Sequence, residues 1–233
     1  MGMNPGLLDI IGDWCRGWGI GAGDAVLDIG TSQLFCEDDP GSLNRFLRHL
    51  NAEPFGDAQL KRLSKRGFAA ELFQRAGLVY EAIDITAYPH TLRLDLNQNS
   101  LPYRRRGRYA LVINSGTTEH VVNQLNAFKI IHDAARVPNG LMYHNVPMCG
   151  DFSHGLFNYN PRFFTRLADA NDYEIERRWI WAADERREYQ EVELAFVNRP
   201  FEAQDAWVNF LLRRRNSQGF RVPVDNVGWP PAA

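Results

Sequence analysis

Short apolar runs alternate with amphipathic stretches along this chain, and two of the apolar runs end in an acid. Residues 25–29 are apolar except for Asp28, and Gly30 follows directly. A second apolar run covers residues 78–85 and carries Asp84 near its end. Runs of four to eight mainly apolar residues, bounded by turn residues, are typical of buried strands. The pattern therefore predicts two strands that each deliver a carboxylate at the carboxyl end.

Helical spacing of apolar residues predicts helices between and around these strands. They are expected at residues 7–18, 43–50, 68–76, 119–135 and 161–170. Further strands are expected at residues 93–97, 109–114, 141–144, 173–181, 191–197 and 206–213. This alternation is typical of an α/β fold in which helices cover both faces of a mostly parallel sheet. No helix is expected between the last three strands, which indicates an antiparallel end to the sheet.

Two segments depart from the alternation within what we expect to be a single domain over residues 1–233. Residues 37–66 follow the first strand with an acidic turn and two short helical patterns, and we expect a helical lid inserted over a pocket. Residues 216–233 contain three prolines and predict an extended tail, which runs either over the surface or onto a second copy in a homodimer.

Composition narrows the class of protein. The chain has 233 residues, of which 45% are hydrophobic and 23% charged, and its net charge is -2. This charge gives no global field that would attract nucleic acid or an anionic membrane. Three widely spaced cysteines fit neither a disulfide framework nor a zinc motif, and neither a membrane-spanning run nor a signal peptide is recognisable. We expect a cytoplasmic protein that binds neither nucleic acid nor membrane.

Polar residues at the predicted strand ends are the first candidates for a binding site. Ligands of open α/β sheets bind beyond the carboxyl ends of the strands, where Asp28 and Asp84 are expected to lie. Either carboxylate could have a structural role instead of binding a ligand; Asp28, for example, could cap a turn. Asp95 and Asn97 could likewise end a strand through local hydrogen bonds.

These residues resemble those of the class I S-adenosylmethionine-dependent methyltransferases, over roughly residues 26–214. The resemblance implies a Rossmann-like, doubly wound, mostly parallel seven-stranded sheet with an antiparallel terminal hairpin. It also implies that S-adenosyl-L-methionine is the cofactor. The residues that would bind it are Asp28, Gly30, Thr31, Asp84, Ile85, Asp95, Asn97 and Asn114. The segments 116–124 and 154–164 resemble a poorly characterised bacterial branch that is linked to saccharide or secondary metabolism.

Methyl transfer requires that the acceptor lose a proton when it is a hydroxyl or ammonium group, and a histidine or carboxylate is the natural base. His120 fits best, because it is expected in the first turn of a helix, where the helix dipole favours a neutral imidazole. A capping or packing histidine is the alternative. Glu119 needs no catalytic role to explain its position, because the helix dipole alone favours an acid at the start of a helix.

A polar segment, residues 144–161, is expected to form a long loop after a buried strand and to contact the acceptor. His144 and His154 join His120 as catalytic candidates. The candidates for acceptor binding are Glu119, Asp151, Asn158 and Tyr159. A loop tied down by its own polar groups is the alternative. Histidines and acids could converge here on a divalent metal, but no ligand spacing is diagnostic, and we predict no metal site.

The sequence thus predicts a methyltransferase that acts on oxygen or nitrogen of a small metabolite, such as a saccharide or secondary metabolite. Two alternatives stay open. One is a cyclase or lyase that uses the sulfonium as a leaving group, and the other is a catalytically inactive methyltransferase-like binding module. A nicotinamide-dependent oxidoreductase is disfavoured because the G-x-G-x-x-G turn is missing.

Overall fold

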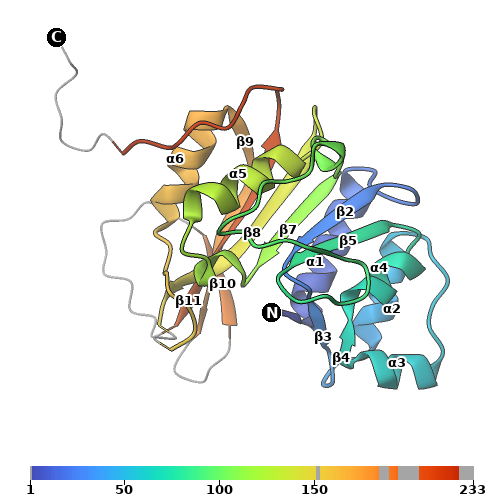
Figure 1. Cartoon of the computed structure of the whole chain (residues 1–233). Coiled ribbons are helices and arrows are strands. Elements are labelled where there is room, and N and C mark those ends of the chain that lie inside the picture. Colours follow the sequence, from blue (N-terminus) through green and yellow to red (C-terminus); the bar gives the residue numbers. More distant parts are fainter. Residues whose placement is uncertain (1, 151–152, 184–188, 194–204, 226–233) are drawn as a thin grey trace, which may run out of the picture.

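One mixed sheet of eight strands organises the molecule (Figure 1). The computed structural model describes residues 2–150, 153–183, 189–193 and 205–225. The parallel strands begin with β2 (Ala25–Ile29), which has β5 (Val79–Asp84) on one side and β7 (Leu111–Ser115) on the other. Outside them lie β6 (Thr91–Arg93) and β8 (Gly140–Cys149). The order of strands therefore reverses between β2 and β7, where open α/β sheets bind their ligands.

The carboxyl-terminal strands complete the sheet in the antiparallel manner expected. β11 (Ala206–Arg214) inserts between β8 and β9 (Tyr173–Ala183) and runs antiparallel to both. β10 (Tyr189–Glu193) pairs with β9 at the edge. The Rossmann-like α/β fold is confirmed: eight strands are described in this sheet, one more than the seven implied by the family resemblance, and β10 at its edge overlaps the strand expected at 191–197. Residues 194–197 of that expected strand lie outside the described residues.

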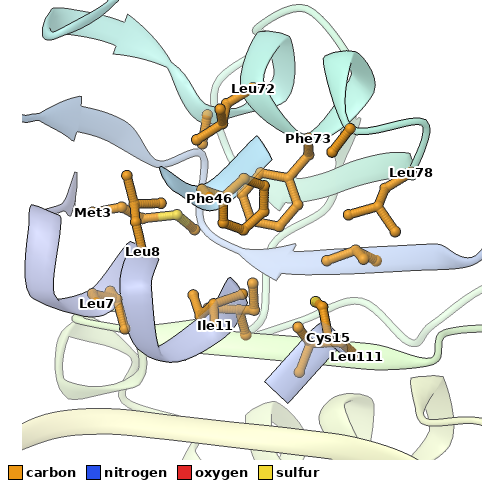
Figure 2. Packing of buried hydrophobic residues seen from close by; sticks show 14 of the residues in the cluster. Met3, Leu7, Leu8, Ile11, Cys15, Phe46, Leu72, Phe73, Leu78 and Leu111 are labelled. Atoms are coloured by element: carbon orange, nitrogen blue, oxygen red, sulfur yellow. The ribbon is translucent and has the colours of Figure 1, made fainter. Parts of the chain in front are cut away.

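One face of the sheet is covered by α1 (Pro5–Gly17), α2 (Gly41–His49) and α4 (Ala69–Arg75). Asn4 caps α1 by accepting a hydrogen bond from Leu7 N at 2.9 Å, and Pro5 occupies its first turn. Figure 2 shows Leu8 and Ile11 of α1 packed beside Phe46 of α2. Burying each of these apolar side chains stabilises the fold by roughly 1.5–3 kcal/mol.

The other face is covered by α5 (Gln124–Ala134) and α6 (Pro161–Asn171). Phe128 and Phe164 from these helices pack together with their ring centroids 6.1 Å apart. The tail crosses this layer (Figure 1): the carbonyl of Gln218 accepts from His132 Nε2 at 2.9 Å, and Asp225 pairs with Arg162. Residues 226–233 of the predicted tail lie outside the described residues.

A small second sheet stands beside the first. β3 (Gln33–Phe35) pairs with β1 (Gly2–Met3) and with β4 (Lys65–Phe68). The segment 37–66 leaves from this sheet, forms α2 and α3 (Asp57–Leu63), and returns to it. Its α2 packs on α1 through Leu43, Phe46 and Leu47. Whether the segment also closes over a ligand stays a prediction.

Three predicted boundaries differ from the structure. The helix expected from residue 119 begins at Gln124, because Asn123 caps it by accepting from Asn126 N. The strand expected at 141–144 continues to Cys149, since β7 and β11 pair with it from both sides. The strand expected at 93–97 lies at Thr91–Arg93, because the Asp95 carboxylate accepts from Asn97 N and holds a turn.

Among the described residues, no helix is long and apolar enough to cross a membrane.

Candidate functional site

A cavity of about 430 Å³ opens at the carboxyl ends of β2 and β5. We call it the strand-end cavity. Six of the predicted cofactor-binding residues line it, which are Gly30, Thr31, Asp84, Ile85, Asp95 and Asn97. They meet because the carboxyl ends of neighbouring parallel strands share one edge of the sheet.

The turn after β2 is tied to the end of β5. Gly30 has a φ of 91°, a left-handed conformation that favours glycine, and its N–H donates to the carbonyl of Ile83 at 2.7 Å. The next residue, Thr31, donates its N–H to Asp84 Oδ2 at 3.0 Å. Asp84 Oδ1 accepts from Thr86 N at 2.9 Å. Since an ionised carboxylate offers about four acceptor positions, Asp84 keeps capacity for a ligand.

Part of the lining of the strand-end cavity is apolar. Leu94, Leu96 and Val121 line it beside Asp95. This combination of apolar side chains and carboxylates suits a ligand that carries both an aromatic ring and hydroxyl donors.

A second cavity, of about 740 Å³, lies on the side of α1 and the small sheet. We call it the tryptophan cavity, because Trp181 of β9 and Trp207 of β11 line it at paired positions of the two strands. Asn145 and His154 add polar groups to the wall. Asn145 is fixed by Ser115 Oγ, which donates to its Oδ1 at 3.2 Å, and by its own Nδ2, which donates to Asn209 Oδ1 at 2.8 Å.

The segment 115–120 separates the two cavities. Ser115 and Gly116 line the tryptophan cavity, whereas Thr117 and His120 line the strand-end cavity. Across the boundary, the ring centroids of His120 and His154 are 5.0 Å apart. The two cavities therefore adjoin at this segment.

Glu119 lies at the centre of the boundary and is fully buried. His154 Nε2 is 3.3 Å from Glu119 Oε1, and His120 Nε2 is 3.9 Å from it. Neither carboxylate oxygen has a hydrogen-bond partner of good geometry among the described residues. Burial raises the pKa of Glu119 above its usual range. The pKa of His120 is lowered, mainly because the ring is partly buried and further because His154 lies nearby.

The loop that carries His154 is built against Glu119. A Cβ on Gly155 would lie 2.8 Å from Glu119 Cγ, so only glycine fits there. The N–H groups of Leu156 and Phe157 both donate to the carbonyl of Glu119, at 2.8 and 3.1 Å. His120 ends a short 3-10 turn (Thr118–His120) rather than starting a helix, which corrects the environment predicted for it.

Three predicted site residues, Asp28, Asn114 and His144, lie away from both cavities. Asp28 is buried below the turn, where its Oδ2 accepts from Tyr80 Oη at 2.7 Å and from Ser32 N at 3.2 Å; burial raises its pKa to about 6. Asn114 and His144 lie inside the α5 and α6 layer, and Asn114 Nδ2 donates to His144 Nδ1 at 3.2 Å. Contacts with a ligand stay predictions for these residues.

The predicted acceptor loop is also rearranged. His144 lies within β8 and not in a loop, because β8 extends further than expected. Tyr159 is buried and donates its hydroxyl to Gln124 Oε1 at 2.7 Å. Asn158 is exposed and lines neither cavity. Asp151 lies outside the described residues.

The sequence analysis missed most of the tryptophan cavity. Its walls include Gly2, Asn4, Pro5 and Gly6 near the start of the chain and Trp207 far along it. Alternation along β9 does place Trp179 and Trp181 on one face of the strand. This alternation does not show that Trp14 and Tyr143 cover Trp179, whereas Trp181 reaches the cavity.

Comparisons with known proteins give remote structural similarities only. No family model matches the chain, and no curated protein matches it. Among solved structures, the trans-methyltransferase CalH in complex with SAH is similar at 14% identity and a TM-score of 0.41. That match covers 90% of this chain and 59% of CalH, so this chain spans less than two thirds of that protein.

Two further solved structures are similar at the same level. One is a SAM-dependent methyltransferase of Thermotoga maritima, described as a possible histamine N-methyltransferase, with 10% identity and a TM-score of 0.38. The other is described as a zinc-dependent alcohol dehydrogenase of Rhodobacter sphaeroides, with 12% identity and a TM-score of 0.35. Each match covers 87% of this chain and 88% of the other. Such values establish neither a family nor an activity for this chain.

Proposed function

We propose that this chain binds S-adenosylmethionine in the strand-end cavity and transfers its methyl group to oxygen or nitrogen of a small molecule in the tryptophan cavity. The supporting observation is that two cavities of different chemistry adjoin at segment 115–120, beside the point where the strand order reverses. A group-transfer enzyme needs donor and acceptor held on two sides of one point.

The residues of the strand-end cavity fit the parts of this cofactor. Asp84 keeps acceptor positions for two ribose hydroxyls, as argued above. Leu96 and Val121 offer apolar surface to an adenine ring, with Asp95 beside them as an acceptor for an amino group. The methionine part of the cofactor would lie near the backbone of the turn at Gly30 and Thr31. A volume of about 430 Å³ lies within the roughly 300–1,000 Å³ common for ligand sites.

When bound, the sulfonium supplies an activated methyl group that leaves by in-line displacement. The protein has to align the acceptor atom and exclude water. Trp181 and Trp207 give the acceptor an apolar, planar surface, and Asn145 and His154 give it polar contacts. This wall suits a small molecule that combines a ring with a hydroxyl or amine. Membership of a saccharide or secondary-metabolite pathway stays a prediction from the sequence.

Calorimetry with S-adenosylhomocysteine tests the cofactor part of the proposal. Asp84→Asn should weaken binding about 10- to 100-fold, because hydrogen bonds to a charged acceptor contribute roughly 1.5–3 kcal/mol. Asp38→Asn is the matched control, since Asp38 is exposed and lines neither cavity. Equal affinities for Asp84→Asn and wild type would remove Asp84 from the site. Failure of the wild type to bind either form of the cofactor would favour the binding-module alternative.

Product analysis tests the chemistry. The protein is incubated with methyl-labelled S-adenosylmethionine and a panel of small hydroxyl and amine compounds, and the mixture is followed by mass spectrometry. Methyl transfer gives S-adenosylhomocysteine and a labelled acceptor in equal amounts. Release of methylthioadenosine instead would contradict methyl transfer and support the cyclase alternative.

A further inference from the structure

We propose that Glu119, His120 and His154 form a binding site for one divalent first-row transition metal at the boundary of the two cavities. One carboxylate oxygen and one nitrogen from each ring all lie within 4.8 Å of one another. The sequence predicted no metal site, because its ligand spacing is not diagnostic. The structure brings His154 next to the consecutive pair Glu119 and His120 through the fold of the loop.

The separations of these atoms suit shared coordination of one ion. Zinc binds histidine nitrogen and carboxylate oxygen at about 2.0–2.2 Å. Two such ligands of a tetrahedral ion are therefore separated by roughly 3.3–3.5 Å. His154 Nε2 and Glu119 Oε1 are 3.3 Å apart, and His120 Nε2 and Glu119 Oε1 are 3.9 Å apart. Small rotations of the His120 and His154 rings would bring all three ligand atoms within coordination distance of one ion.

The carboxylate of Glu119 is the second, independent observation. The side chain is fully buried, and among the described residues neither oxygen has a hydrogen-bond partner of good geometry, His154 Nε2 being 3.3 Å from Oε1 as an ion-pair contact. Burying a carboxylate without partners costs far more than burying one that is hydrogen-bonded. A cation held against Oε1 would offset this cost.

The surroundings of Glu119 are built to hold its position. Gly155 leaves no room for a larger residue against Glu119 Cγ, and two N–H groups, of Leu156 and Phe157, donate to the Glu119 carbonyl. Gly116 has a φ of 71°, and a Cβ there would lie 3.4 Å from Oε1. The carboxylate is therefore confined from two sides, while the two histidine side chains are partly exposed and admit an ion from solvent.

The donor set points to the class of metal. Imidazole nitrogens suit zinc, iron, nickel and copper, whereas magnesium and calcium prefer oxygen ligands. Three protein ligands leave at least one position open, as in catalytic zinc sites. Because His120 lines one cavity and His154 the other, that open position is reachable by a ligand in either.

This inference does not depend on the proposed methyl transfer. It replaces the proton-accepting role predicted for His120 with a ligand role. If both proposals hold, an acceptor oxygen that occupies the open position would be bound next to the strand-end cavity.

Titration with cobalt(II) alone tests the site. Tag-free protein is stripped with a chelator, dialysed, and titrated while visible absorption and heat are recorded. We expect one ion per chain, with the visible bands of tetrahedral or five-coordinate cobalt, and displacement by zinc but not by a large excess of magnesium. Absence of saturable binding would overturn the proposal, whatever the result with S-adenosylhomocysteine.

Variants locate the ion. His154→Asn and Glu119→Gln should each weaken cobalt binding at least 30-fold. His90→Asn is the matched control, because His90 is exposed and lies outside the group. Its affinity should equal that of the wild type.

Folding is checked by circular dichroism. Should Glu119→Gln fail to fold, His120→Asn serves instead, since that side chain is 44% exposed. Unchanged affinity in His120→Asn and His154→Asn would place the ion elsewhere and contradict the proposal.

Discussion

Two groups of buried polar side chains behave differently in this molecule. In the layer of α5 and α6, both ring nitrogens of His132 have partners, Tyr173 Oη and the carbonyl of Gln218, and His144 accepts from Asn114. At the boundary of the cavities, neither carboxylate oxygen of Glu119 has a hydrogen-bond partner of good geometry in the part of the chain that the structure describes. All of these side chains except Tyr173 are at most 1% exposed.

The difference separates stability from binding. A buried polar group whose partners are all within the fold holds neighbouring elements in one arrangement, and its removal is felt as lost stability. A buried charge without partners costs stability, and it is retained where a ligand completes it. His144 and Asn114, which the sequence analysis assigned to the site, have the first character. Glu119 has the second character, because it is buried and its carboxylate oxygens have no hydrogen-bond partner of good geometry among the described residues.

The largest expected effect is a loss of stability on acidification, caused by His132 and His144 in the layer of α5 and α6. Burial lowers the pKa of His132 to about 4 and that of His144 to about 3, from an ordinary 6.5. The unfolded chain therefore binds protons that the folded chain refuses, so stability is complete above pH 6.5 and is lost as the pH falls toward 4 and below. Each shift of one pKa unit corresponds to 1.36 kcal/mol, which gives about 3 kcal/mol for His132 alone.

Urea unfolding at pH 7.5, 6, 5 and 4 measures this loss. His144→Phe should flatten the curve, because it removes one of the two groups and fits between Phe128 and Phe164. An unchanged curve in His144→Phe would show that other groups cause the acid sensitivity.

His144→Ala should destabilise the fold without touching the cavities. It opens a hole beside Phe164, whose ring centroid is 5.0 Å from that of His144, and it removes one partner of Asn114. We expect a loss of about 2–4 kcal/mol, as for other large-to-small core changes. Urea unfolding gives the loss, and calorimetry should find S-adenosylhomocysteine and cobalt affinities within twofold of wild type. A tenfold fall in either affinity would return His144 to the site.

Asp28→Asn tests an intermediate case. Asp28 Oδ2 has two hydrogen-bond partners, whereas its buried Oδ1 has none among the residues that the structure describes. Its folded pKa of about 6 is raised by burial above the ordinary 3.8, so its contribution is present below pH 4 and is lost as the pH rises through 6. The variant should therefore gain about 2 kcal/mol relative to wild type between pH 4 and pH 8. Parallel stability curves for the two proteins would contradict the raised pKa.

Glu119→Gln should give the smallest change, a gain in stability rather than the loss expected for His144→Ala. In metal-free protein at neutral pH it removes a buried carboxylate that has no hydrogen-bond partner of good geometry within the described ranges, and we expect unfolding to cost about 1 kcal/mol more than in wild type. Glu81→Gln is the matched control, because Glu81 accepts three hydrogen bonds from Arg105 and one from Tyr109. It should lose stability. Equal losses in both variants would mean that Glu119 is satisfied within the fold.

The sequence by itself determined the strand-end cavity. Asp84 could be placed there because buried parallel strands have a short apolar pattern and because their carboxyl ends share one edge, and the family resemblance implied Gly30 and Asp95. The sequence also determined the α/β class, because apolar residues recur with different periods in strands and helices and the two patterns alternate along the chain. Local competition by Asp and Asn side chains moved the boundaries, as at Asp95, but left the placement of the residues intact.

Only the tertiary structure decided the other half of the site. The approach of His154 to Glu119 depends on the path of a loop, and the tryptophan cavity depends on β11 entering between β8 and β9. The length of β8 likewise followed from pairing on both sides, and this pairing moved His144 from an expected loop into the core. These contacts join distant parts of the chain, and local periodicity carries no information about which distant surfaces meet.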